Sequence, residues 1–278
     1  MKLAVQLVLL PGRTVADQAK WASDHGVEGI ELGMKPVADL MSAADRIADR
    51  VPVCSVCGNC DATGTPRFDF LHPKPAKRRA AIDASKALLA FCGQVGAAGQ
   101  IVPPIFGPPL VPDLSPVHDP VALEDMLMAA ALEELGPFAA GHGTCLFLEP
   151  LNRYEQHYLR RQVDGVRAIE RSGVEGVRLL SDLFHMHIEE TDTPAALRAA
   201  GRHVGHLHLA DNTRLEPGTG DIDFTAAFTA LADIGFEGFM AYECGISGEG
   251  DAQRGENLAR SLEKMRASIA DARQAART

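Results

Sequence analysis

The sequence predicts a (β/α)8 TIM barrel, in which eight parallel strands close into a ring that helices surround. Three observations favour this fold. The chain has 278 residues, close to the roughly 250 typical of one barrel. Short apolar runs alternate with longer Ala-rich amphipathic stretches, and no Gly/Ser linker or charge block divides them. The strand–helix pairs number eight, which favours closure into a barrel. An open doubly wound sheet shares this local pattern and is therefore the alternative. We expect residues 1–278 to form one domain.

The expected strands are Lys2–Leu9, Val27–Leu32, Val51–Val56, Gln100–Val102, Thr144–Leu148, Gly176–Ser181, His203–Leu209 and Phe239–Glu243. The expected helices are Val15–His25, Val37–Arg50, Pro75–Ala98, Pro120–Gly141, Gln162–Ser172, Thr193–Ala200, Phe224–Ile234 and Gly255–Ala270. Local signals agree with these bounds. Thr14 is a suitable N-cap for the first helix, and Gly26 and Gly235 are suited to end helices. Continuously apolar strands such as residues 145–148 are typical of sheets covered by helices.

Composition excludes several classes of protein. The formal charge is −10, from 37 acidic and 27 basic side chains, and such a surface repels the phosphate backbone of nucleic acids. No apolar run approaches the roughly 20 residues that span a bilayer, so no membrane partner is expected. Residues 1–10 superficially resemble a signal sequence, but Gln6 interrupts them and no small-x-small cleavage site follows. We interpret them as a buried first strand and expect a cytoplasmic protein.

Ligand-type side chains stand at the ends of four successive strands. The fifth strand ends in Glu149, the sixth in Asp182, the seventh in the pair His206 and His208, and the eighth in Glu243. In such barrels, reactive groups lie at the carboxyl ends of the strands, so these side chains can converge on one point. A lone acid after a strand is usually a helix cap or a solvated residue, so the signal lies in the set. Three carboxylates and one of the two imidazoles suit Mn²⁺, Mg²⁺ or Co²⁺ better than a structural zinc.

Four motifs resemble those of the xylose-isomerase-like superfamily, and within it the ketose 3-epimerases and hydroxypyruvate isomerases. They are residues 149–155 (EPLNRYE), 182–186 (DLFHM), 206–211 (HLHLAD), and 217–220 (PGTG) with Asp223-Phe224. The resemblance covers nearly the whole barrel and is sharpest over residues 145–245. It implies one divalent metal ion, with Mn²⁺ favoured, and a sugar substrate in carbohydrate metabolism. It also implies a homodimer or homotetramer.

The resemblance assigns a role to each site residue. Glu149 and Glu243 would bind the metal and serve as the acid–base pair on opposite faces of the sugar, and Asp182 and His208 would be ligands only. The resemblance also implies a substrate-binding role for three further side chains: His185, Arg214 and Glu155. His206, on the same face of its strand as His208, is expected to be a buried supporting residue.

The chemistry expected of such a site starts with removal of the proton next to a carbonyl group. A divalent cation stabilises the enediolate that results. One carboxylate removes the proton, and a second can return it from the other face, which inverts the carbon. Return to the neighbouring carbon is instead aldose–ketose isomerisation. A ketose 3-epimerase is therefore the main functional prediction, and a hydroxypyruvate-isomerase-like enzyme is the alternative.

Three other functions are compatible with the scaffold but less favoured. A dehydratase of an inositol or sugar derivative would begin with the same proton abstraction. An abasic-site endonuclease would need extra histidines, yet Asp223 stands where that family carries one. A non-catalytic sugar-binding barrel would have no need for paired carboxylates.

Two motifs remain outside these assignments. Cys54, Cys57 and Cys60 form a C-x-x-C-x-x-C run, but no second paired-cysteine cluster completes a zinc site, so packing is the favoured interpretation and their role stays open. Residues 217–220 lack the lysine of a phosphate-binding P-loop, which favours a turn or lid beside the site. The Pro/Gly-rich segments 11–13, 59–75 and 103–120 are expected to form pocket walls or an oligomer contact.

Overall fold

The computed structural model describes residues 1–276, and these residues form a closed eight-stranded parallel barrel. Closure is direct, because β1 pairs in parallel with β2 on one side and with β8 on the other. The strands are β1 (Lys2–Gln6), β2 (Gly29–Leu32), β3 (Val53–Cys57), β4 (Gly99–Val102), β5 (Cys145–Leu148), β6 (Val177–Asp182), β7 (Val204–Leu209) and β8 (Phe239–Tyr242). The predicted barrel is confirmed, and the open sheet is excluded. The predicted domain extends to residue 278, and its last two residues lie outside the described part.

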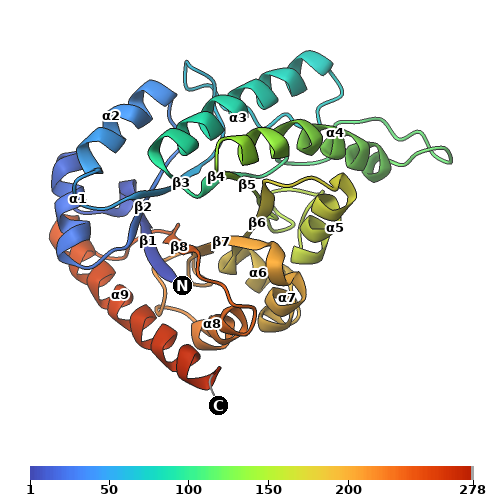
Figure 1. The fold of residues 1–278 in the computed structure, drawn as a ribbon. Helices are drawn as coiled ribbons and strands as arrows, with labels where there is room; N and C mark the ends of the chain where they lie inside the picture. The colour runs from blue at the N-terminus through green and yellow to red at the C-terminus, as the bar shows by residue number, and fades with distance from the viewer. Residues whose placement is uncertain (277–278) are drawn as a thin grey trace.

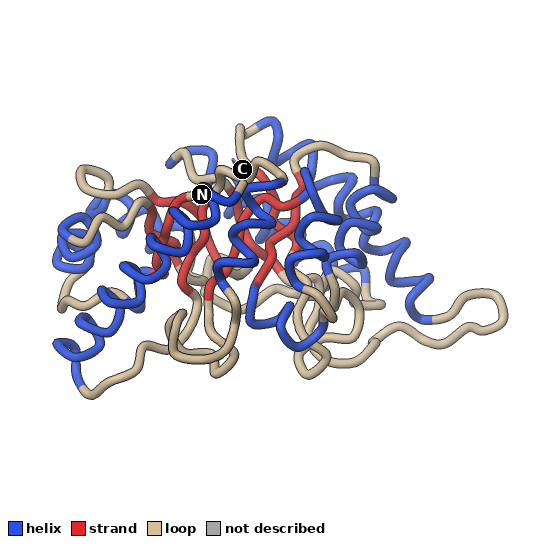
Figure 2. The backbone as a smooth tube through the Cα atoms, turned by 90° about the horizontal axis from the view of Figure 1, so that it is seen from below, coloured by secondary structure: helices blue, strands red, loops and turns tan. Residues whose placement is uncertain are grey.

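Helices surround the ring of strands (Figure 1), and the strands form the middle of the molecule when it is turned by 90° (Figure 2). The helices are α1 (Val15–Asp24), α2 (Val37–Ile47), α3 (Pro75–Val95), α4 (Pro120–Gly141), α5 (Gln162–Ser172), α6 (Leu183–Glu189), α7 (Thr193–Ala200), α8 (Phe224–Asp233) and α9 (Gly250–Ala275). Most helix and strand bounds lie within a few residues of those predicted. No helix in residues 1–276 has both the length and the apolar character that crossing a membrane requires.

Two elements differ from the prediction. The first strand ends at Gln6, and Leu7–Leu9 form a 3₁₀ turn instead of continuing the strand. An apolar run does not reveal where a strand leaves its sheet, and here Val8 is 78% exposed while its neighbours pack on the core. Helix α6 was not predicted. It is only seven residues long and begins directly after Asp182, whose side chain accepts the backbone N–H groups of Phe184 and His185.

The main apolar core lies between the strands and the helices, and smaller clusters fill the lumen of the barrel. Ala4, Cys54 and Ala241 meet in one lumen cluster. The other joins three larger side chains: Ile101, Phe147 and Leu180. Because side chains on a strand alternate between faces, Gln6, Glu149, Asp182 and Glu243, each two positions beyond one of these residues, also face the lumen, nearer its carboxyl end.

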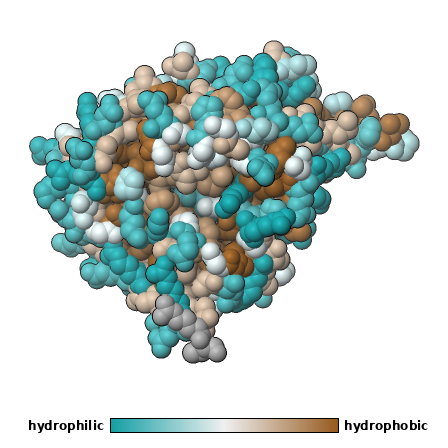
Figure 3. Space-filling model, in the orientation of Figure 1, coloured by the Kyte–Doolittle hydropathy of each residue, from teal (hydrophilic) through white to brown (hydrophobic). Residues whose placement is uncertain are grey.

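The segment between β4 and α4 projects from the barrel (Figure 1). Its residues 107–119 carry three exposed apolar side chains, since Leu110, Leu114 and Val117 are 47%, 49% and 75% exposed. The space-filling view shows apolar atoms on this projection (Figure 3). We refer to residues 107–119 as the projecting arm.

The N-cap of α1 offers a test of a local signal. The Thr14 hydroxyl accepts the backbone N–H of Asp17 at 3.1 Å, and the Asp17 carboxylate accepts the backbone N–H of Thr14. Because Thr14→Ala leaves one N–H of the first turn without this partner, we expect it to lower the free energy of unfolding by about 1 kcal/mol. Urea unfolding followed by circular dichroism would measure this. Thr14→Ser should retain the wild-type midpoint, and an unchanged midpoint in Thr14→Ala would contradict the assignment.

Candidate active site at the carboxyl ends of the strands

The four predicted metal ligands face the lumen of the barrel. Each lies two positions after another residue that faces the lumen, and side chains on a strand alternate between its two faces. The pairs are Phe147 and Glu149, Leu180 and Asp182, His206 and His208, and Ala241 and Glu243. In β7 the register with β6 skips Gly205, so that His206 lies opposite Leu180 and His208 opposite Asp182. The alternation of β-strands thus carries all four side chains to the carboxyl end of the barrel.

The four side chains form one compact cluster. One ligand atom from each of Glu149, Asp182, His208 and Glu243 can be chosen such that all lie within 4.8 Å of one another. Nδ1 of His208 lies 3.0 Å from Oε2 of Glu243, 3.5 Å from Oε1 of Glu149 and 3.9 Å from Oδ2 of Asp182. Asp182 and His208 are fully buried, and Glu149 is 4% exposed. Three carboxylates this close can all stay ionised only if positive charge compensates them.

Two observations indicate that the cluster fits a divalent cation. Within residues 1–276, Nδ1 of His208 has no partner with suitable hydrogen-bond geometry, although it is buried among carboxylates. The guanidinium of Arg214 donates to Asp182 at 2.6 Å and also to Glu243, so it compensates one of the three negative charges. The donor set is the second observation. Three oxygen ligands and one nitrogen match the preferences of Mn²⁺, Mg²⁺ or Co²⁺.

The site perturbs the pKa values of its acids in opposite directions. Burial raises the pKa of Glu149, and the nearby charge of Glu243 adds to this increase. Burial acts on Glu243 in the same direction, but His208 and Arg214 outweigh it and lower its pKa to about 2. Burial lowers the pKa of His208, yet Glu243 and Glu31 raise it well above its ordinary value. A cation bound at Nδ1 would replace the proton that these carboxylates favour.

The three predicted substrate-binding residues border the cluster. His185 is 3% exposed, and its Nε2 lies 3.7 Å from Oδ2 of Asp182. Glu155 lies next to His185, with its Oε1 3.7 Å from Nδ1 of that ring. Arg214 has a left-handed backbone with φ of +57°, a conformation that costs a non-glycine residue about 1 kcal/mol or more. The ring of Phe184 supports its guanidinium at 4.7 Å.

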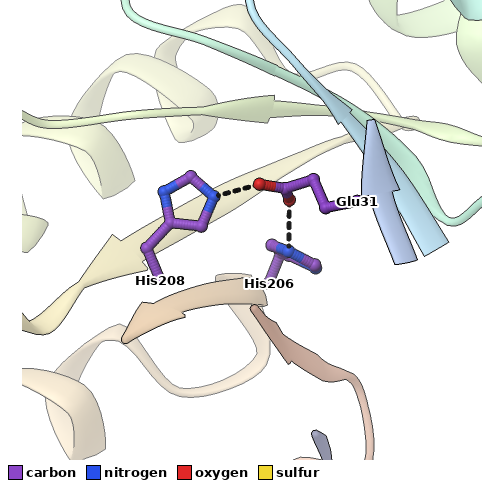
Figure 4. A group of neighbouring side chains, drawn as sticks. All are labelled: Glu31, His206 and His208. Atoms are coloured by element: carbon purple, nitrogen blue, oxygen red, sulfur yellow. Dashed lines mark hydrogen bonds and ion pairs between the residues drawn. The ribbon is translucent and has the colours of Figure 1, made fainter. Parts of the chain in front are cut away.

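Several side chains in contact with this cluster were not predicted. Glu31, in β2, accepts hydrogen bonds from His206 and His208 (Figure 4). Gln6 and the Cys57 thiol both donate to Oε1 of Glu243, each at 3.2 Å. A charged residue within the otherwise apolar run Gly29–Leu32 was a detectable signal for Glu31. The only local signal at Gln6 is a polar residue within an apolar run, and no local signal separates Cys57 from its neighbours.

Asn152, within the motif of residues 149–155, is another residue of the site that the sequence did not predict. Its side-chain amide donates to Nδ1 of His185 at 2.7 Å, and to Oε1 of Glu155 at 3.0 Å. Because Nδ1 of His185 accepts this bond, the ring proton lies on Nε2, directed toward Asp182. Asn152 therefore orients two of the predicted substrate-binding side chains.

The loop that contains the PGTG motif is folded around Asp211. Its carboxylate accepts the backbone N–H groups of Asn212, Gly218 and Ile222. Gly220 passes so close that a Cβ there would lie 1.9 Å from Oδ1 of Asn212. Since Asp211 already uses the backbone donors at 218 and 222, they are not free to bind a phosphate. This agrees with the predicted turn beside the site.

Comparison with known proteins places this geometry among related barrels. The model of the family described as xylose isomerase-like TIM barrel matches residues 19–268. The chain is 30% identical over 257 residues to the 3-dehydro-D-guloside 4-epimerase of Escherichia coli, which covers 91% of this chain and 95% of that protein. A shorter match, 38% identical over 114 residues, is to the L-ribulose 3-epimerase of Mesorhizobium japonicum. It covers 41% of this chain and 38% of that protein.

The solved structures give the same result for the fold. The crystal structure of a 3-keto-D-glucoside 4-epimerase from E. coli in its apo form superposes with a TM-score of 0.82 and 27% identity. The superposition covers 96% of this chain and 99% of that one.

The cluster predicts stabilisation by divalent cations. Because the four ligand groups are brought together only in the folded chain, Mn²⁺ at 100 times its Kd should stabilise chelator-treated protein by about 2.7 kcal/mol. For a chain of this size this corresponds to a rise in Tm of roughly 5 to 10 °C. Scanning fluorimetry at constant ionic strength would measure it.

Asp182→Asn should lose most of this shift, because it removes the charge of one buried ligand. Asp221→Asn is the matched control, since this carboxylate is 69% exposed and lies outside the cluster. Equal shifts in the two variants would show that Mn²⁺ acts elsewhere.

Proposed function

Because this chain belongs to the xylose isomerase-like TIM barrel family, we propose that it is a divalent-metal-dependent sugar epimerase that inverts a carbon next to a ketone. The curated relatives described above are sugar epimerases, which supports an enzyme of the isomerase class. The observation that carries the proposal is the convergence of Glu149, Asp182, His208 and Glu243 within 4.8 Å.

In this proposal, Glu149 and Glu243 exchange the proton with the substrate. They directly follow β5 and β8, and Nδ1 of His208 lies within 3.5 Å of a carboxylate oxygen of each. One carboxylate removes the proton next to the ketone, which leaves an enediolate. The other returns a proton from the opposite face, so that the carbon is inverted. The two residues exchange roles when the reaction runs in reverse.

The same four side chains would hold the cation, for which Mn²⁺ is favoured and Mg²⁺ or Co²⁺ is possible. When bound, a divalent cation supplies positive charge that stabilises the negative charge left on the sugar oxygens, an effect worth several kcal/mol. Asp182 has no acid–base role in this proposal. Its contact with Arg214 at 2.6 Å also fixes that guanidinium at the edge of the site.

Three side chains would hold the sugar. The Nε2–H of His185, oriented by Asn152, can donate to a hydroxyl or carbonyl oxygen. Arg214 can release some of its contacts with the carboxylates to a substrate oxygen. Glu155, whose side chain is 43% exposed, can accept from a sugar hydroxyl. Together they orient the sugar so that the reacting carbon lies between the two acid–base groups.

Two substrate classes fit this chemistry. A ketose inverted at C3 reacts next to its C2 ketone, whereas a 3-keto glycoside inverted at C4 reacts next to its C3 ketone. The same acid–base pair serves both. The relative that acts on a 3-dehydro-guloside matches 257 residues, against 114 for the L-ribulose 3-epimerase. We therefore rank a 3-keto glycoside ahead of a free ketose.

Self-association in the cytoplasm, as a homodimer or homotetramer, is part of the proposal. The projecting arm supports it, since Leu110, Leu114 and Val117 expose apolar surface there. Burying such surface against a second copy would remove it from water.

The acid–base assignment predicts that Glu149→Gln and Glu243→Gln each lower kcat at least about a thousandfold, because an amide cannot exchange the proton. Glu170→Gln is the matched control, as its side chain is 59% exposed and lies outside the cluster. Bound metal is measured in each variant, which separates loss of proton transfer from loss of the cation. Turnover near the wild-type rate in either variant would overturn that residue's role.

The substrate assignment predicts inversion of a 3-keto glycoside in D₂O, with one solvent deuterium at the inverted carbon and the ketone unmoved. The panel also includes free and phosphorylated ketoses, each with Mn²⁺, Mg²⁺ or Co²⁺, and NMR locates the label. Transfer of the carbonyl to the neighbouring carbon would indicate an isomerase, and a conjugated ketone would indicate a dehydratase. Either result would overturn the epimerase.

A further inference from the structure

Beneath the proposed metal ligands, the lumen contains a fourth carboxylate, which is buried and which the proposed reaction does not use. Glu31 is in β2, and its side chain is fully buried. Its carboxylate lies between the rings of His206 and His208, with one oxygen directed to each (Figure 4). A buried carboxylate is costly unless it is paired and hydrogen-bonded, so this arrangement calls for a physical reason.

Both oxygens of Glu31 are saturated with donors. Oε1 lies 3.0 Å from Nε2 of His208 and 3.0 Å from Nε2 of Gln6. Oε2 lies 2.7 Å from Oγ of Ser55 and 3.1 Å from Nε2 of His206. The register explains this geometry, because Gln6 and Ser55 lie directly opposite Glu31 in the two neighbouring strands. The carboxylate is thus held rigidly by three strands.

The hydrogen bond between Glu31 and His208 decides which nitrogen of His208 is available to a cation. An ionised carboxylate only accepts hydrogen bonds, so Nε2 of His208 must carry the proton that it donates to Glu31. The lone pair of a neutral imidazole then lies on Nδ1, which faces Glu149, Asp182 and Glu243. The opposite tautomer would direct an N–H at the metal position and a lone pair at a carboxylate.

We propose that Glu31 is a positioning residue, which holds the proton of His208 on Nε2 and thereby directs the Nδ1 lone pair to the divalent cation. This inference rests on the metal site of the proposed function. Gln6 extends the effect, because its side-chain amide lies 3.0 Å from Oε1 of Glu31 and 3.2 Å from Oε1 of Glu243. One buried carboxylate therefore positions one ligand directly and another through a single amide.

A purely structural role for Glu31 makes a different prediction. If the carboxylate only filled the lumen, replacing it by an isosteric amide would change stability and leave the affinity for the cation unchanged. Glu31→Gln tests this, because its amide offers one acceptor oxygen in place of two and carries no charge. At least one of the two histidines must then change its partner or its tautomer.

The experiment measures Mn²⁺ binding in the absence of sugar, by calorimetry and by electron paramagnetic resonance. We expect Glu31→Gln to raise the Kd for Mn²⁺ by 10- to 100-fold, and to shift the visible absorption of the Co²⁺-loaded protein. Thr144→Val is the matched control. It removes a buried hydrogen bond, from Oγ1 of Thr144 to the carbonyl of Ala97, at the opposite end of the barrel. Its Kd should stay within twofold of wild type.

A Kd within threefold of wild type in folded Glu31→Gln would overturn the proposal. If that variant does not fold, the wild-type protein still provides a test. Long-range ¹H–¹⁵N spectra of the Mg²⁺-loaded protein should show His208 protonated on Nε2, and a proton on Nδ1 would overturn the proposal.

The outcomes for the two proposals are separate. A wild-type protein that binds Mn²⁺ and shows the Glu31→Gln effect, yet epimerises no sugar, would overturn the proposed reaction and support the role of Glu31. If the wild-type protein epimerises a sugar and Glu31→Gln has unchanged Mn²⁺ affinity, the result would support the proposed reaction and overturn the role of Glu31.

Discussion

The hydrogen-bonded pairing of β1 with β8 closes the sheet, and the site depends on this closure. In a closed parallel barrel every second side chain points into one lumen, and all strands run toward the same end. Residues more than 200 positions apart in the sequence, such as Gln6 and Glu243, then lie within hydrogen-bond distance. An open sheet would spread the same side chains along one edge. Closure therefore turns separate strand ends into a single cluster.

The lumen is divided by function between the two halves of the barrel. Strands β5 to β8 end in the proposed cation ligands, whereas β1 to β3 supply the side chains that hold those ligands. Glu31 donates no proton to the site and accepts from His208, while Gln6 and Cys57 donate to Glu243. A ligand set without such partners would leave each ring and carboxylate free to rotate, which weakens cation binding. The supporting half is thus as much a part of the site as the ligand half.

Electrostatic repulsion between carboxylates destabilises this arrangement. Four carboxylates lie close together in the lumen, and Arg214 and His208 offset only part of their charge. Removing carboxylates from water is unfavourable unless positive charge compensates them, and a divalent cation would supply it. The opposite pKa shifts of Glu149 and Glu243 arise from the same crowding, since one is raised by burial and the other is lowered by His208 and Arg214.

The sequence alone determined the fold class, because alternation of apolar and amphipathic segments depends only on local periodicity. It also determined which strand ends carry Glu149, Asp182, His208 and Glu243, and the structure brings these four together. Tertiary structure alone decided which residues support them. The contact between Glu31 and His208 joins residues 177 positions apart, and no local pattern encodes it. The strand register and its skips at Cys54 and Gly205 set which side chains meet in the lumen, and register is a property of pairing between strands.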